Sequence, residues 1–256
     1  MNSVAAFGRI LFALALIGFG IEHILQRGIV IGVELAPPWP PSHMVWGYIT
    51  AAILILGGLC LAFRWIPAVA CIVLAALFFN AVVLLDLHRV LADWKELTNR
   101  TRFLETLCLG GAALIFIGLL TRGTRASGLW RTAQILALIG TWLFALSMIV
   151  FGIDHMLVPA FIASLIPKWI PFPLYWAWGT ALAMVAAGVA FLTRIGGRAA
   201  AILLGLMFLG WVIVLHAPRI YAALHNGAEW NSGILCLAMS GIAFALSNST
   251  AIRKGF

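Results

Sequence analysis

The chain contains eight apolar runs, each close to the length of about 20 residues that crosses a bilayer as a helix. Backbone polar groups find no water partner inside a membrane, so each run is expected to be helical. Of the 256 residues, 64% are hydrophobic and 9% charged, against about 25% charged in soluble domains. We therefore predict an all-α, multi-pass protein with eight helices in a lipid bilayer. The runs are about Val4–Leu25, Met44–Phe63, Ile66–Leu87, Phe103–Leu120, Gln134–Gly152, Leu174–Leu192, Ala199–Leu215 and Ser232–Leu246.

Basic residues are distributed unevenly among the links between these runs. The N-terminal segment, the links after every second run and the C-terminal segment contain no Asp or Glu. Lys and Arg are enriched in cytoplasmic loops, so both termini are predicted to be cytoplasmic. This placement explains the formal net charge of +8 without a nucleic-acid partner. The basic residues concerned are Arg9, Arg64, Arg122, Arg125, Arg131, Arg194, Arg198, Arg253 and Lys254.

The second half of the chain repeats the plan of the first. The segment FGIEH at 19–23 returns as FGIDH at 151–155, which is 132 positions later (155 minus 23). Repeated landmarks in the same order indicate internal duplication. We predict two four-helix units, 1–122 and 132–256, with a cytoplasmic linker at 123–131. An even number of spans in each unit predicts a pseudo-twofold axis along the membrane normal. The later landmarks are Pro-x-Trp-x-Pro around Trp39 and Trp169, Trp46-Gly47 and Trp178-Gly179, and Arg64 and Arg194.

Ionisable residues gather at the predicted periplasmic ends of the helices. Such groups next to hydrocarbon are costly and therefore need a partner or a function. We predict that the histidines bind a ligand or relay protons, that the aspartates accept protons, and that the arginines orient a ligand oxygen. A structural hydrogen-bond network at the helix ends is the alternative. The mixed-charge segment 91–102 is predicted to be a solvated outer loop. The predicted catalytic residues are His23, Asp86, Arg89, Asp154, His155, His216 and Arg219, and the predicted cofactor contacts are Glu22, His88, Trp39 and Trp169.

Three kinds of function remain open for this cluster. A quinone site needs histidine or arginine beside a carboxylate and flat apolar walls, which these residues can supply. A metal or haem site would use the same cluster, with His23 and His155 as the haem pair. A transporter or an assembly partner would use the outer cluster as a vestibule. The sequence leaves open whether there is one shared site or two equivalent ones. The candidate metal ligands are His23, His88, His155 and His216.

The first run resembles the opening helix of DoxX-like membrane proteins. That helix runs from an arginine, here Arg9, to a Gly-x-x-Lys/His ending, here Gly20 and His23. The second unit departs from the pattern, because Thr141 stands where the arginine would fall, and both units have His where Lys is commoner in the family. The resemblance implies a bacterial inner-membrane protein linked to redox systems, with the small subunit of thiosulfate:quinone oxidoreductase as one related group. We therefore favour a quinone-interacting subunit or oxidoreductase with a periplasmic or membrane redox partner.

Overall fold

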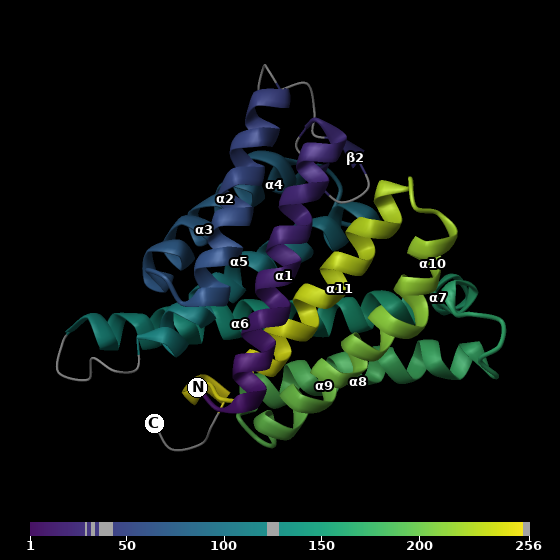
Figure 1. Ribbon diagram of the computed structural model, residues 1–256. Helices are drawn as coiled ribbons and strands as arrows, with labels where there is room; N and C mark the ends of the chain where they lie inside the picture. Colours follow the sequence, from purple (N-terminus) through teal and green to yellow (C-terminus); the bar gives the residue numbers. More distant parts are fainter. Residues whose placement is uncertain (29, 32–33, 36–42, 122–127, 253–256) are drawn as a thin grey trace.

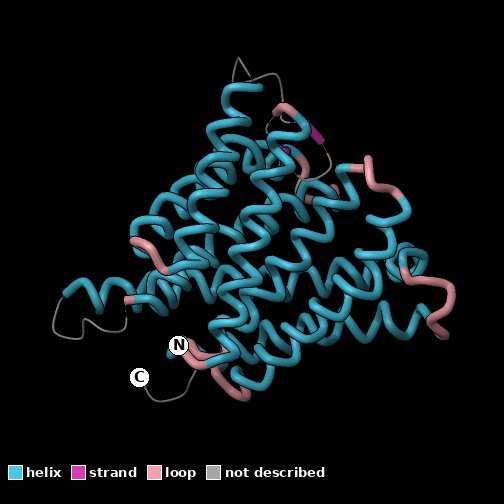
Figure 2. Tube along the Cα trace, viewed as in Figure 1, coloured by secondary structure: helices cyan, strands magenta, loops and turns pink. Residues whose placement is uncertain are grey.

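The computed structural model describes all residues except 29, 32–33, 36–42, 122–127 and 253–256 (Figure 1). Within the described part, the regular secondary structure is helical apart from a two-residue antiparallel ladder between β1 (Val30–Ile31) and β2 (Glu34–Leu35), and loops join the elements (Figure 2). Eight of its helices are long and apolar enough to cross a membrane. This confirms the predicted all-α class and a multi-pass membrane protein. Trp39 lies outside the described residues, as does the linker up to residue 127, while 128–131 belong to a helix.

Two of the eight spans are built from three consecutive helical segments, and the other six are single helices. The elements are α1 (Ser3–Gln26), α2 (His43–Phe63), α3 (Pro67–Ala81) continued by η1 (Val82–Asp86) and α4 (Leu87–Ala92), α5 (Leu97–Leu120), α6 (Gly128–Leu157), α8 (Pro173–Thr193), α9 (Gly197–Trp211) continued by η2 (Val212–His216) and α10 (Ala217–Ala222), and α11 (Gly227–Leu246), with the short α7 (Pro159–Leu165) and η3 (Thr250–Ile252).

The spans pack in a closed order, α1–α2–α3–α5–α6–α8–α9–α11, and α11 returns to α1. In Figure 1, α1 (purple) and α11 (yellow) lie side by side although they come from opposite ends of the sequence. The contact of α5 with α6 is the counterpart of the contact of α11 with α1. The last helix of each half therefore packs against the first helix of the other half.

Glycines allow the closest of these helix contacts. A Cβ at Gly8 would lie 2.6 Å from the carbonyl oxygen of Gly241, and a Cβ at Gly140 would collide with that of Gly111. Small residues let helix backbones approach in membranes, where packing replaces the hydrophobic effect as the driving force. The two junctions between the halves are thus built in the same way.

Similar glycine contacts recur in the two halves at a nearly constant spacing in the sequence. Gly20 faces the carbonyl oxygen of Ala51, and Gly152 faces that of Ala181. The shift between corresponding residues is therefore 132 in the first helix of each half and 130 in the second (181 minus 51). By this correspondence Trp46 matches Trp176. The Trp-Gly pairs singled out in the sequence differ in surroundings, since Gly47 packs on the backbone of Gly28 while Gly179 has no neighbour within 4 Å.

Both three-part spans contain a single π-helical turn. These turns cover Val82–Asp86 and Val212–His216, again 130 positions apart (216 minus 86). A π-turn inside an α-helix shifts the side chains that follow it and occurs often at functional sites. It places Asp86 and His216 at corresponding points near the same ends of their spans.

The helices α5 and α11 form the centre of the molecule. They are the most enclosed spans, with 72% and 67% of their apolar windows buried, and they contact each other. The predicted solvated loop at 91–102 is wrong in its second half. There α5 begins at Leu97 and its first turns bury Arg100 and Arg102, because these guanidinium groups turn inward to polar partners.

Candidate functional site

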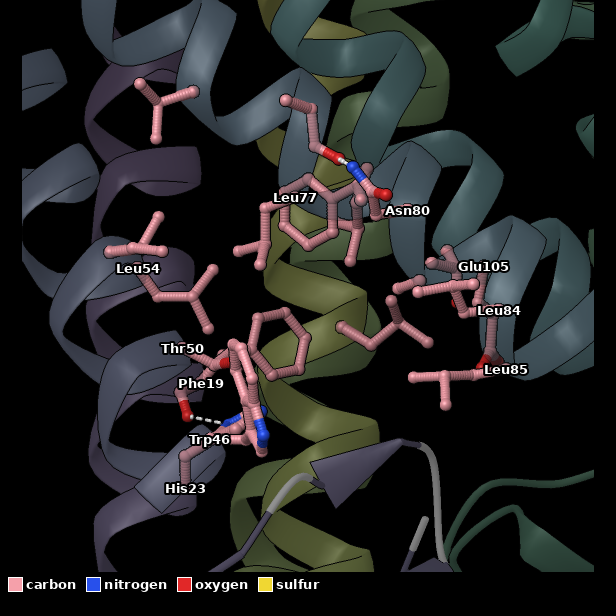
Figure 3. Close-up of a pocket in the computed structure, with 18 of the residues that line it drawn as sticks. Phe19, His23, Trp46, Thr50, Leu54, Leu77, Asn80, Leu84, Leu85 and Glu105 are labelled. Carbon is pink, nitrogen blue, oxygen red and sulfur yellow. Dashed lines mark hydrogen bonds between the residues drawn. The ribbon is translucent and has the colours of Figure 1, made fainter. Parts of the chain in front are cut away.

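One cavity lies mainly among helices of the first half of the chain and has a volume of about 700 Å³. Its walls come from α1, α2, α3 with η1, α5 and α11, and most of them are apolar side chains. Figure 3 shows His23, Trp46 and Thr50 on one side of this space and Leu84, Leu85 and Glu105 on the other. The volume lies within the range of about 300–1,000 Å³ that is typical of small-molecule sites. The polar groups among its lining residues are His23, Thr50, Asn80, Glu105, Thr106 and Asn231.

The second cavity has about 320 Å³ and lies mainly among helices of the second half. Its walls come from α6, α7, α8, α9 with η2, α11 and α5. Phe151 and His155 line it as Phe19 and His23 line the first. His23 and His155 thus line two different cavities, although Glu105 and Leu235 belong to both linings.

His23 and His155 are held in the same way. The Nδ1 atom of each ring lies 2.8 Å from the carbonyl oxygen one turn earlier, at Phe19 and Phe151 respectively. A carbonyl can only accept, so Nδ1 is the donor, and a neutral imidazole then keeps an acceptor lone pair on Nε2. Each histidine therefore brings one oriented acceptor to its own cavity.

The acids beside these histidines have structural partners instead. Glu22 accepts a 3.3 Å hydrogen bond from Asn231 of α11. Asp154 forms a buried ion pair with Arg100 of α5, in which Arg100 Nε lies 3.1 Å from Oδ2 and Nη2 bonds Oδ1. Adjacent residues on a helix point about 100° apart, so the histidine faces the cavity while the acid joins two helices. Neither acid is among the lining residues of its cavity.

The predicted pairs on the third span of each half are placed differently from each other. Asp86 is buried at the end of η1, where Thr106, Arg102 and Arg89 face its carboxyl group. His216 lines the second cavity, and its buried Nδ1 has no hydrogen-bond partner among the described residues. Arg219 forms a bidentate ion pair with Glu229 at 2.7 and 2.8 Å.

Four predicted ligand contacts lie away from both cavities. Neither Arg89 nor Arg219 appears among the described lining residues. His88 is exposed on α4, and Trp169 is 71% exposed in the link after α7. These side chains do not meet the histidines that the sequence grouped with them.

The metal and haem alternatives find less support in this geometry than the quinone alternative. Among the described residues, no three His, Cys, Asp or Glu side chains come together as a metal site. The candidate haem pair is separated as well, because His23 and His155 line different cavities.

Glu105 was not among the site residues predicted from the sequence. It lies on α5, two turns inside the helix, and it lines both cavities. Its charged neighbours are Arg102 and Asp86. The available signal was a carboxylate within an apolar run, but only the contact of α5 with α11 shows that it lies between the two sites.

The two cavities differ in the side chains at their borders. Ile72 and Val73 of α3 line the first cavity and are 58% and 43% exposed, so this cavity opens sideways beside α3. At the second cavity, Trp211 packs edge to face on Trp176 at 6.3 Å and joins α9 to α8. Ala81 stands where Trp211 would correspond, which leaves the first cavity wider.

The fold and its cavities define a multi-pass membrane protein with two buried, mostly apolar sites. Comparison with protein-family models, curated proteins and solved structures gives no match for this chain.

Proposed function

We propose that this protein binds a quinone or quinol in its first cavity and serves a redox system of a bacterial cytoplasmic membrane. The observation that carries the proposal is a large apolar cavity that opens beside α3 and receives the oriented His23 ring. A quinone is flat, apolar and dissolved in the bilayer, so a sideways opening is the route it needs. Its oxygens need a few polar partners in an otherwise apolar site.

The lining residues suggest how a headgroup would be held. His23 Nε2 can accept a hydrogen bond from a quinol hydroxyl. Asn231 donates one amide N–H to Glu22 and has a second that can donate to a quinone oxygen, while Thr106 Oγ1, which donates to the Arg102 carbonyl oxygen, can accept from a quinol hydroxyl. Glu105 can exchange one of the two protons that reduction of a quinone to a quinol requires. The electrons would come from a separate redox partner, as the resemblance to DoxX-like proteins implies.

The same proposal includes the architecture and its orientation. We take the halves to be duplicated units related by a pseudo-twofold axis along the membrane normal, with both termini in the cytoplasm. The reciprocal contacts of α1 with α11 and of α6 with α5, and the two π-turns, support the duplication. The basic residues at alternate links support the orientation, which puts the histidines at the periplasmic side.

Binding of a short-chain benzoquinone to the purified protein in lipid nanodiscs tests this function. We expect saturable binding, with a roughly ten-fold loss of affinity in His23→Leu, because a buried hydrogen bond contributes about 1 kcal/mol or more. His225→Leu is the matched control, since His225 is exposed in the turn before α11. Absence of saturable binding to the wild-type protein, or unchanged binding in His23→Leu, would exclude this site.

A further inference from the structure

Methionines gather around the second cavity. Met148, Met184, Met207 and Met239 line it, one each from α6, α8, α9 and α11. The chain has seven methionines in total, and none of the described residues that line the first cavity is a methionine. The enrichment is therefore specific to one of two otherwise similar sites.

The corresponding positions of the first half are all leucine. The contact correspondence pairs Met148 with Leu16 at a shift of 132, and the other three with Leu54, Leu77 and Leu109 at a shift of 130. Leucine and methionine have nearly equal volumes and exchange in cores at little cost. Packing volume alone does not explain four such replacements around one cavity. The four methionines together change the chemistry of the cavity wall, because each brings a polarisable thioether sulfur.

Other donor atoms line the same cavity. Cys236 stands where the first half has Thr106, and its Sγ donates to the Phe208 carbonyl oxygen at 3.3 Å. His155 presents Nε2, and His216 has a buried Nδ1 without a partner among the described residues. The cavity is thus bordered by thioether, thiol and imidazole groups, and it shares Glu105 with the first cavity.

We propose that the second cavity binds a soft monovalent metal ion, Cu(I), through its methionine sulfurs. Thioether and thiolate ligands select Cu(I) over harder ions. A single positive charge is also less costly to bury than a divalent one, because neutral thioethers bring no compensating charge. Zn²⁺ favours three or four His, Cys or acidic ligands, and no such group occurs among the described residues. This site does not depend on quinone binding in the first cavity.

Titration of the purified full-length protein with Cu(I) against a chromophoric chelator, and with Ag(I) as a redox-inert analogue, tests the proposal. We expect one tightly bound ion per chain and an X-ray absorption spectrum with sulfur scatterers around copper. Changing all four cavity methionines to leucine (M148L, M184L, M207L and M239L) should weaken binding at least 100-fold. The protein itself tolerates leucine at the corresponding positions of its first half, so this variant is expected to fold.

Two controls separate thioether ligation from other causes. Met44→Leu and Met156→Leu change methionines that do not line the cavity and should bind Cu(I) as the wild type does. Cys236→Ser measures the thiol contribution separately. A wild-type protein that binds no stoichiometric Cu(I) or Ag(I), an absorption spectrum without sulfur scatterers, or full binding in the four-leucine variant would each overturn the proposal. Quinone binding in the first cavity is measured independently, so failure of either site is recognised by itself.

Discussion

Arg100 and Asp154 form a buried ion pair with two hydrogen bonds, and this pair joins the first turn of α5 to the last turn of α6. Their side chains are 10% and 6% exposed. A buried charge that loses its partner stays desolvated without compensation. The pair therefore matters for the junction between the halves, not for proton transfer to a ligand.

We expect Asp154→Ala to lower the free energy of unfolding by about 3–5 kcal/mol, because Arg100 is left unpaired. Unfolding in mixed detergent–SDS micelles measures this change. Glu229→Ala is the comparison, because its partner Arg219 is 36% exposed and such pairs contribute about 0–1 kcal/mol. Equal losses in the two variants would contradict the structural role assigned to Asp154.

Glycine contacts at the junctions lead to a second prediction. Gly241→Ala places a Cβ 2.6 Å from the Phe12 amide nitrogen and 2.8 Å from the Gly8 carbonyl oxygen. Both neighbours are backbone atoms, so the helices must separate, at a cost of about 1–3 kcal/mol. Gly210→Ala serves as control because nothing lies within 4 Å of its Cβ position. The same unfolding assay should show destabilisation in Gly241→Ala and not in Gly210→Ala. A free energy of unfolding equal to that of the wild type in Gly241→Ala would contradict the close helix contact.

How much of this could be predicted from the sequence depends on whether a feature is local. Eight spans follow from apolar length alone, and His23 and His155 are marked by a repeated motif next to hydrocarbon. The partners of Glu22 and Asp154 could not be predicted, because Asn231 and Arg100 come from helices distant in the chain. Asp86 and Arg89 were grouped with the histidines only by their common end of the membrane, which does not specify the cavity that each faces.

Corresponding residues of the two cavities explain why they differ in size, and they allow an exchange experiment. Ala81 lines the first cavity and Trp211 lines the second. We expect Ala81→Trp to narrow the first cavity and to abolish quinone binding, as the indole would occupy part of the 700 Å³ space. Trp211→Ala should widen the second cavity and remove its contact with Trp176.

The number of benzoquinone molecules bound per protein in nanodiscs distinguishes these variants. The wild type should bind one molecule, Ala81→Trp none, and Trp211→Ala up to two. Phe172→Ala removes an exposed ring that lines neither cavity. This control variant should still bind one benzoquinone molecule per protein. Unchanged binding in Ala81→Trp would show that the quinone lies elsewhere.

Glu105 is expected to influence both sites, because its side chain lines both cavities from the central helix α5. The histidines, by contrast, each line a single cavity. His23→Leu should therefore weaken quinone binding and leave the affinity for Cu(I) unchanged. His155→Leu should weaken Cu(I) binding and leave the affinity for the quinone unchanged. Glu105→Gln keeps the shape of the side chain but removes its ability to ionise and to exchange a proton, so it should alter both affinities. In particular, it should weaken Cu(I) binding, since a carboxyl group that ionises beside a buried cation stabilises that cation. If Glu105→Gln changes neither affinity while the histidine variants behave as expected, the two cavities work independently and Glu105 is only a neighbour of Arg102 and Asp86.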